Sequence, residues 1–338
     1  MLEIIKKSKK VTLANLDSLK FKYDKGTTKE LLRYSLEKNI EVYRVFDDKF
    51  IFILKKNGKI FWLNKALTSK ASPIGINIAR DKNLTIRLLK KIGYPVAQSE
   101  IISSLSELKN AMKNFSFPVV LKPVGSAEGK GVTVNIKTKE LLFESFEVAM
   151  LFDKKVLIEK YIQGNYYRLT YIADGSYAAT KNIPAYINGD GRKTAKELIE
   201  DENKNNKERG SRGRLKKITV SEKAARFLAS EGYNFNSIIP LDKKIPLCFS
   251  GFDGGEYINI TEKVHLYFIE MAKKISAILE LPIIGIDIIA SNITEPLPKT
   301  GGVILEINGT YPDIQFHNVP TKGESINLAP KLIDYLFN

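Results

Sequence analysis

The feature that most constrains this fold is a pair of short apolar runs that carry polar side chains, Ile286–Ile288 and Val303–Asn308. Both runs contain β-branched residues, which favours strands. Pairing of the two strands would bring Asp287 next to Glu306 and Asn308, and such oxygen ligands suit Mg²⁺ shared with a nucleotide phosphate. The alternative is two buried strands with stray polar residues, but an unpaired carboxylate in an apolar strand is costly, which favours the metal site.

Alternation along the second run divides its side chains into two sets. Successive side chains of a strand point to opposite faces. We therefore expect Glu306 and Asn308 on one face, and Leu305 and Ile307 on the other face, in the core.

Composition indicates a globular chain. Its 338 residues are 43% hydrophobic and 27% charged, which suffices for more than one compact unit and differs from a disordered protein. The net charge of +15 is compatible with nucleic-acid binding, but the lysines are scattered and no arginine–aromatic stripe stands out. Nucleic acid is therefore not expected as a partner.

Targeting signals are not evident in the sequence. Cys248 is the only cysteine, which excludes an internal disulfide and fits a reducing compartment. The lysine-rich residues 1–11 lack the apolar stretch of a secretory signal, and no apolar run approaches the roughly 20 residues that span a bilayer. We expect a cytoplasmic protein without a membrane partner.

Local patterns divide the chain into a small N-terminal unit and a larger remainder. Residues 1–75 predict a reduced α/β domain, with a capping box at Thr27–Glu30 that opens a helix and a hairpin turn at Asn57-Gly58. In the remainder, residues 76–338, a long amphipathic helix is predicted over 261–279.

A glycine-rich segment, 124–132, joins two predicted strands. Glycines allow backbone N–H groups to approach phosphate oxygens and to adopt positive φ. The segment is not a Walker A loop, because no Ser or Thr follows Lys130 and a strand is expected behind it. Two interpretations stay open, an ordinary glycine hairpin and a flap over phosphates with Lys122 as a cation at the end of the preceding strand.

Three further features have two interpretations each. Val156–Ile162 is either a strand that presents backbone groups to an adenine edge or a core strand with a polar exit. Residues 201–217 are almost all polar and form either a mobile loop over a site or a solvated disordered segment. His317 is either a substrate contact or a structural histidine.

The order of these features resembles the ATP-grasp ligases. Residues that follow the family's order and approximate spacing are Lys82, Lys122, the 124–132 loop, Glu159, Arg168, Asp287, Glu306 and Asn308. The local sequence is similar to one branch, the cyanophycin synthetases and the C-terminal half of bifunctional glutathione synthetases. The segments that carry this similarity are Ala79–Lys82, Pro184–Gly191 and Gly301–Asn308. The resemblance covers roughly residues 28–337.

The resemblance implies an α+β fold in which a nucleotide lies between two sheet-bearing subdomains. The ATP-grasp domain would cover 76–338, after the small N-terminal domain. Its central and lid subdomain would cover 76–160, and its C-terminal catalytic subdomain 161–338.

The resemblance also implies roles for individual residues. Those expected to bind ATP are Lys82, Lys122, Gly125, Ser126, Gly129, Lys130, Gly131, Glu159, Lys160, Tyr161, Ile162 and Tyr166. Among them, Lys82 and Lys122 would contact phosphates and base, the glycine loop would cover the phosphates, and Glu159 would face the adenine. Arg168 would lie near the γ-phosphate or acyl phosphate, with further catalytic cations at Arg212 and Arg214. The expected ligands of two Mg²⁺ ions, with Mn²⁺ as the alternative metal, are Asp287, Glu306 and Asn308.

The family's chemistry would activate a carboxylate as an acyl phosphate, release ADP, and let an amine displace phosphate. Positioning and charge neutralisation would supply most of the rate, which agrees with the absence of a Ser/His/Asp or Cys/His arrangement. We expect amino acids or short peptides as substrates, and a homo-oligomer is compatible with the resemblance. The alternatives are an enzyme of this fold that modifies a ribosomal precursor peptide and a non-catalytic, ATP-binding regulatory relative.

Three positions depart from the family's pattern. Tyr166 stands where many relatives carry an acidic residue for the ribose hydroxyls. Leu247–Ser250 lacks an arginine that helps relatives to hold the transferred phosphate, and one of the two loop arginines could replace it. Ile314-Gln315 stands where cyanophycin synthetases place a substrate-facing arginine, which argues against cyanophycin as the product.

Overall fold

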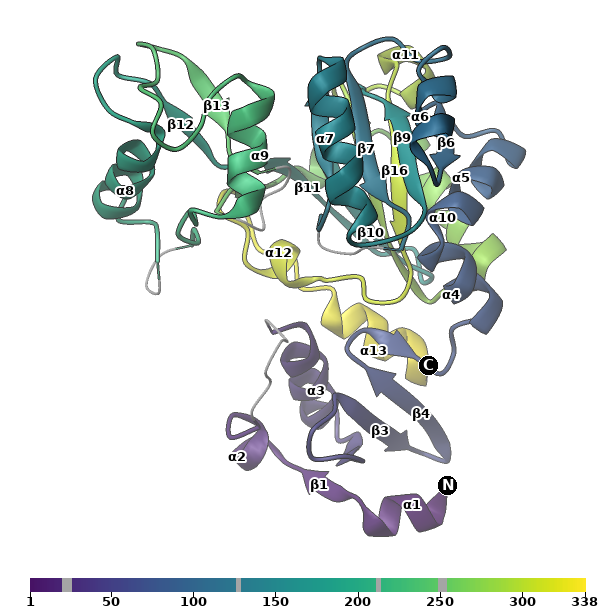
Figure 1. The fold of residues 1–338 in the computed structure, drawn as a ribbon. Helices are drawn as coiled ribbons and strands as arrows, with labels where there is room; N and C mark the ends of the chain where they lie inside the picture. Colours follow the sequence, from purple (N-terminus) through teal and green to yellow (C-terminus); the bar gives the residue numbers. More distant parts are fainter. Residues whose placement is uncertain (20–25, 126–128, 211–213, 249–253) are drawn as a thin grey trace.

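The computed structural model describes residues 1–19, 26–125, 129–210, 214–248 and 254–338. Figure 1 shows an α+β architecture in which helices cover several antiparallel sheets, as the sequence predicted. No helix within the described ranges is long and apolar enough to cross a bilayer.

The first sheet is a meander of five antiparallel strands near the N-terminus. Its strands, in spatial as in chain order, are β1 (Lys9–Val11), β2 (Glu41–Arg44), β3 (Ile51–Lys56), β4 (Lys59–Asn64) and β5 (Leu67–Thr68). The accompanying helices are α1 (Leu2–Lys7), α2 (Leu13–Leu16) and α3 (Thr27–Glu37). The predicted hairpin turn is confirmed, because Asn57 and Gly58 join β3 to β4 with φ of 48° and 78°.

The predicted capping box at the start of α3 is wrong. The N-cap is Gly26, in the left-handed region with φ of 116°, and Thr27 is already helical. Instead of capping the helix, the Thr27 hydroxyl donates to Asp313 Oδ1 at 2.6 Å. A tertiary contact to a residue far along the chain has therefore replaced the local one.

A helix from the other end of the chain completes the first sheet's core. Figure 1 shows α13 (Ala329–Phe337) between that sheet and the rest of the molecule. Leu332 and Leu336 of α13 are buried with Leu31 of α3 and Leu54 of β3. The same core reaches residues at the end of the central sheet, namely Ile172, Ala178 and Ile283. Apolar burial thus joins this unit to the sheet that carries the site.

A four-stranded antiparallel sheet, which we call the lid sheet, follows. Its strands in spatial order are β6 (Ser99–Ile102), β9 (Val156–Lys160), β7 (Val119–Pro123) and β8 (Thr133–Ile136). Its helices are α6 (Leu105–Ala111) and α7 (Lys139–Met150). Leu121 and Ile158 from the sheet share a core with Leu108 and Phe146 from the helices.

The central sheet has five antiparallel strands in the order β14 (Glu256–Asn259), β11 (Tyr177–Ile183), β10 (Asn165–Ile172), β15 (Ile283–Ala290) and β16 (Val303–Asn308). Its associated helices are α4 (Pro73–Arg80), α5 (Lys82–Lys91), η2 (Thr261–Lys263), α10 (Leu266–Leu279), α11 (Leu297–Thr300) and α12 (Gln315–Asn318). The amphipathic helix predicted over 261–279 is confirmed as α10, although α10 begins at Leu266. Its apolar face packs Phe268, Met271 and Ile275 against Ile286 and Ile288 of β15.

Residues 184–210 and 214–248 form a separate arm, at the left of Figure 1. It contains β12 (Tyr186–Asn188), α8 (Ala195–Asn205), α9 (Glu222–Ser230) and β13 (Lys244–Pro246), around a core of its own. The prediction of a loop over 201–217 is wrong for its first residues, because α8 continues to Asn205. Polar side chains can extend a helix whose other face is anchored in a core, as Ile199 anchors this one.

Truncation of a buried side chain of α13 should reveal how strongly this helix stabilises the first sheet. Leu332→Ala should lower the free energy of unfolding by about 2–5 kcal/mol, because it leaves a cavity in the shared core. Lys331→Ala, on the exposed side of the same helix, is the control and should change it by less than about 0.5 kcal/mol. Urea denaturation measures both variants, and equal losses would contradict the packing described above.

Candidate functional site

A row of polar side chains crosses the central sheet. The register pairs Arg168 of β10 with Asp287 of β15, and Asp287 with Glu306 of β16. Directly opposite residues project from the same face of a sheet, so the three side chains are neighbours. Thr180 of β11 extends the row beyond Arg168. The predicted pairing of the two apolar runs is therefore confirmed.

Arg168 and Asp287 form a buried ion pair in the middle of this row. Arg168 Nη2 donates to Asp287 Oδ2 at 2.9 Å, and Arg168 Nε donates to Oδ1. Their side chains are only 8% and 2% exposed. Gly285 makes room for the guanidinium, because a Cβ there would lie 2.9 Å from Arg168 Nη1. Since a buried charge needs its partner, each of the two side chains holds the other in place.

Asn308 bridges the two carboxylates of the row. Its Nδ2 donates to Asp287 Oδ2 at 3.0 Å and to Glu306 Oε1 at 3.3 Å. Two carboxylates and an amide are the oxygen-rich set that Mg²⁺ prefers, and rotation of the amide would present its oxygen in place of the nitrogen. Within the part of the chain that the structure describes, no group of three or more His, Cys, Asp or Glu side chains could hold a metal. The residues present fit a divalent cation only if the amide serves as the third ligand.

The ionisation of the row reflects its burial and its charges. Burial is the main cause that raises the pKa of Asp287 to about 7, and Glu306 adds to this rise while Arg168 opposes it. Burial alone would also raise the pKa of Glu306, but the hydrogen bond with Asp287 and the charges of Arg168, Lys82 and Lys122 outweigh burial and lower it. Negative charge is therefore concentrated near Lys82 and Lys122, which come from another part of the chain.

A β-bulge re-aims one side chain of β16. Asp287 pairs with Glu306 but Ile288 pairs with Ile304, so Leu305 has no partner in the register. Ile304 lies in the core beneath the sheet, whereas Leu305 packs in a different cluster. The prediction that Leu305 faces the core is wrong, because the extra residue of a bulge breaks the period of two.

That small apolar cluster, which we call the cleft cluster, lies beside the row. Its members are Ala97, Ile162, Tyr166, Ile289, Val303 and Leu305. The last three come from β15 and β16, and Ile162 comes from the segment 161–164 that links the lid sheet to the central sheet. Leu305 was not expected here, and only the bulge could have revealed it. Ile162, Tyr166 and Leu305 are only partly buried, so the cluster leaves some apolar surface beside the charged row.

Tyr166 is one of the positions at which the sequence departs from the expected pattern of the family. Burial, and then the charge of Asp287, raises the pKa of its hydroxyl above the ordinary tyrosine value. The phenol is therefore neutral and can donate a hydrogen bond, whereas a carboxylate could only accept one.

Two lysines bring positive charge to the same region. Lys82 begins α5, and its Nζ donates to the carbonyl of Val124, at the start of the glycine loop, at 3.2 Å. Lys122 Nζ lies 2.7 Å from Glu159 Oε2, and the two side chains are 11% and 6% exposed. Burial lowers the pKa of Lys82, and the negative charge of Glu306 opposes this change. Lys82 and this predicted metal ligand therefore interact electrostatically.

The glycine loop uses the backbone freedom that its sequence predicted. Gly129 and Gly131 have φ of 71° and 70°, a region that other residues rarely adopt. Gly125 N donates to Asp153 Oδ2 at 2.7 Å, which fixes the entrance of the loop, and a Cβ at Gly125 would lie 2.8 Å from that oxygen. Lys130 is exposed, and Ser126 lies outside the described residues.

The linker that follows β9 is only partly buried. Tyr161 and Ile162 are half-buried and Lys160 is exposed. The Tyr161 N–H donates to the carbonyl of Pro118 at 3.2 Å, so it is already engaged within the lid sheet.

His317 is a buried neutral side chain. Its Nε2 lies 2.8 Å from the hydroxyl of Thr170, which follows Arg168 on the same face of β10. Burial, with a smaller contribution from Arg168, lowers the pKa of His317 to about 3. The neighbouring Phe316 ring lies 5.4 Å from the Arg168 guanidinium carbon. This geometry favours the structural interpretation of His317, in which α12 supports the polar row.

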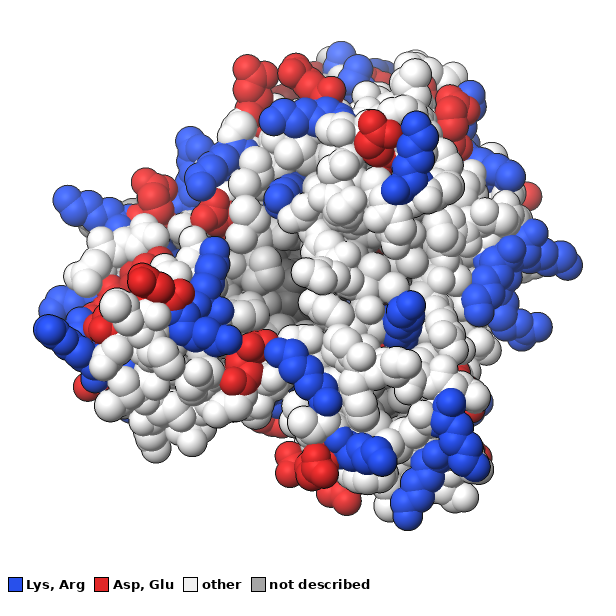
Figure 2. Space-filling model, turned by 90° about the horizontal axis from the view of Figure 1, so that it is seen from above, with Lys and Arg blue, Asp and Glu red and all other residues white. Residues whose placement is uncertain are grey.

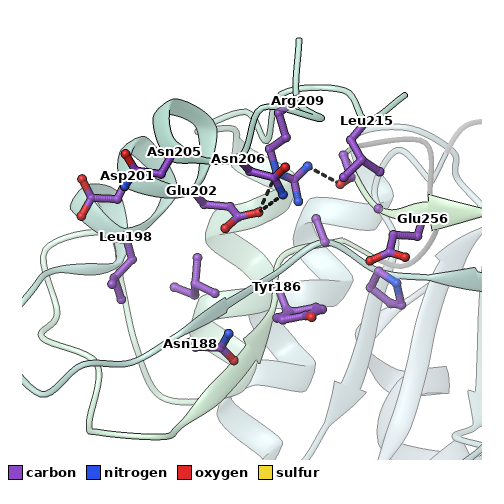
Figure 3. Close-up of a pocket in the computed structure, with 15 residues that line it drawn as sticks. Tyr186, Asn188, Leu198, Asp201, Glu202, Asn205, Asn206, Arg209, Leu215 and Glu256 are labelled. Atoms are coloured by element: carbon purple, nitrogen blue, oxygen red, sulfur yellow. Dashed lines mark hydrogen bonds and ion pairs between the residues drawn. The ribbon is translucent and has the colours of Figure 1, made fainter. Parts of the chain in front are cut away.

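The predicted loop arginines, Arg212 and Arg214, are not seen to join the polar row and its lysines in the residues that the structure describes. Arg214 is exposed, and Arg212 lies outside the residues that the structure describes. Arg209 is instead an anchor within the arm, since it donates to Glu202 at 2.9 Å and to the Gly254 carbonyl at 2.6 Å. Figure 3 shows it at the rim of a polar pocket of about 410 Å³, whose lining contains none of the residues predicted to bind ATP or metal.

Comparison with known proteins agrees with this arrangement. Residues 80–191 match the family described as phosphoribosylglycinamide synthetase, ATP-grasp (A) domain. The cyanophycin synthetase of Synechocystis sp. is 31% identical over 281 residues, which are 81% of this chain and 32% of that protein. The glutathione biosynthesis bifunctional protein of Clostridium perfringens is 28% identical over 340 residues, which are 98% of this chain and 43% of that protein.

A crystal structure of a bifunctional glutathione synthetase from Pasteurella multocida has a TM-score of 0.60 and 28% sequence identity, and the match covers 92% of this chain and 44% of that one. The chain thus spans less than half the length of these relatives. Its fold and the matches define an ATP-grasp protein. Within that class it is a relative of the cyanophycin synthetases and bifunctional glutathione synthetases, as the sequence predicted.

The ion pair at the centre of the row should show strong energetic coupling. Asp287→Asn should lower the free energy of unfolding by about 3–5 kcal/mol, because it leaves the Arg168 charge buried without its partner. Arg168→Met should cost less, because Asp287 can then take up a proton. The double variant should lose clearly less than the two single losses together, as measured by guanidinium denaturation. Additivity within about 0.5 kcal/mol would mean that the pair is not coupled.

Proposed function

We propose that this protein is an ATP- and Mg²⁺-dependent ligase that activates a carboxylate as an acyl phosphate and couples it to an amine. The observation that carries the proposal is the row Arg168–Asp287–Glu306, with Lys82 and Lys122 close enough to lower the pKa of Glu306. Anionic ligands for a metal and cations for phosphates are thus concentrated in one place. This combination suits a nucleoside triphosphate with its divalent cation.

In this proposal the nucleotide lies between the lid sheet and the central sheet. The cleft cluster would receive the adenine ring, with Leu305 and Ile162 as apolar contacts. The glycine loop would cover the phosphates with its backbone N–H groups, and Lys82 and Lys122 would neutralise them. The Tyr166 hydroxyl, which has a hydrogen bond with Asp287, would act as a donor beside the nucleotide. This is the opposite hydrogen-bonding role from the carboxylate that the family's pattern predicts.

Asp287, Glu306 and Asn308 would hold the metal, which supplies charge neutralisation on the transferring phosphoryl group. The raised pKa of Asp287 supports this role, because a buried carboxyl with a carboxylate neighbour is in a site that favours an added positive charge. We propose Mg²⁺ as the ion and two ions as their number.

The reaction would proceed by two displacements. A substrate carboxylate oxygen attacks the γ-phosphorus, and the bond to the β-phosphate oxygen breaks to release ADP. An amine nitrogen then attacks the acyl carbon, the carbon–oxygen bond to phosphate breaks, and the amine loses a proton. Arg168, which Asp287 holds in place, would stabilise the negative charge on the transferred phosphoryl group in both steps.

Amino acids or short peptides are the proposed substrates. The relatives named above are a cyanophycin synthetase and glutathione synthetases, which supports this class without selecting a member. A cytoplasmic location belongs to the same proposal and is supported by the single, buried cysteine.

ADP release tests the proposal directly. Purified protein with ATP and Mg²⁺ should release ADP and phosphate in the presence of one pool among amino acids, dipeptides and amines. Glu306→Gln should reduce this rate at least about 100-fold, because it removes a charge from the metal site. Glu262→Gln, an exposed carboxylate on η2, is the matched control and should retain the wild-type rate. A wild-type protein that binds no ATP would contradict the proposal. ATP binding without ADP release from any pool would instead favour the regulatory relative or a precursor-peptide substrate.

A further inference from the structure

The arm is docked on the lid sheet by a cluster of charged and polar contacts. Helix α9 of the arm packs against β8. Just after α9, Glu231 Oε1 accepts from Asn135 Nδ2 at 3.1 Å and from Lys137 Nζ at 3.0 Å. Lys243, from the arm itself, lies 3.5 Å from the other oxygen of Glu231. The Glu231 side chain is only 16% exposed, so these contacts are partly shielded from solvent.

This docking places a lysine of the arm against the glycine loop. At Gly129, a Cβ would lie 3.2 Å from Nζ of Lys223 and 3.3 Å from its Cε. Lys223 belongs to the first turn of α9, two residues after the N-cap Ser221, and is half-buried. The ammonium group therefore reaches the loop that follows Lys122 and precedes β8.

The first turn of α9 carries Glu222 beside Lys223. A helix N-terminus carries a partial positive charge. An anion bound at the loop would therefore be attracted both by the Lys223 ammonium group and by the N-terminus of α9.

We propose that Lys223 is a further catalytic residue that contacts the phosphates of the bound nucleotide from the arm. This inference rests on the proposed function and extends it to an element that the sequence prediction did not include. It also offers a substitute for the missing arginine of 247–250. Leu247 and Cys248 have no cationic side chain and are buried in the arm's own core. Figure 2 shows lysines and arginines of both sides around a hollow between the arm and the rest of the molecule.

The inference predicts a specific pattern among charge variants. Lys223→Gln should weaken binding of Mg²⁺-ATP about tenfold or more, because a hydrogen bond to a charged group is lost. Lys223→Arg should retain most of the affinity, because the charge and donor remain. Lys196→Gln, which removes one exposed lysine from α8 of the same arm, is the matched control and should bind as the wild type does. Isothermal titration with Mg²⁺-ATP measures all four proteins, and thermal unfolding without nucleotide confirms equal folding.

The outcomes separate this inference from the function on which it rests. Wild-type protein that fails to bind ATP overturns the proposed function, and this inference with it. Wild-type binding with equal affinity for the Lys223→Gln and Lys196→Gln proteins overturns the role of Lys223 alone. Equal losses in the Gln and Arg variants also overturn it, because they would show that side-chain shape rather than charge matters. A steady-state assay of ADP release separates effects on KM for ATP from effects on kcat. If Lys223 were merely structural, neither constant would change in a way that depends on the charge of the replacement.

Discussion

The buried pair of Arg168 and Asp287 is the interaction on which the site depends. Two charges that are almost entirely removed from solvent must be held in hydrogen-bonding geometry, and here adjacent strands of one sheet supply that geometry. The sheet's opposite face is a continuous apolar core, and helix α10 covers it. Packing on one face therefore fixes the strand register, and the register fixes which charges meet on the other. Gly285 completes the arrangement, since any side chain at that position would displace the guanidinium.

Sequence reasoning succeeded where a local rule and the tertiary structure agree. The pairing of the strands around Asp287 and Glu306 followed from composition and alternation, and Ile307 lies in the core as expected. The same rule failed at Leu305, because a bulge is a property of two paired strands and leaves no signal in one of them. Thr27 failed for a related reason, since its hydroxyl found a partner in Asp313, which no local pattern could indicate.

The arm was the least predictable part of the molecule. Its polar residues suggested a loop or disorder, yet α8 continues through them because Ile199 and its neighbours anchor one face of the helix in a small core. A polar sequence can therefore hide a folded unit when few apolar residues suffice to anchor it. For the site this matters, because the contribution of α9 depends on how that unit docks and not on any motif along the chain. The resemblance to ATP-grasp ligases, by contrast, rested on motifs and could be recognised without the structure.

The shared core of α13 and the first sheet has a consequence for how the protein is made. Leu31 and Leu54 pack in part against Leu332 and Leu336, which are synthesised about 280 to 300 residues later. During translation the first sheet must therefore emerge with an apolar face uncovered, and it stays so until the helix has left the ribosome. The lid sheet and the arm, whose cores close among nearby residues, have no such delay. Order of synthesis and order of completion thus differ in this chain, and its earliest strands are among the last to be finished.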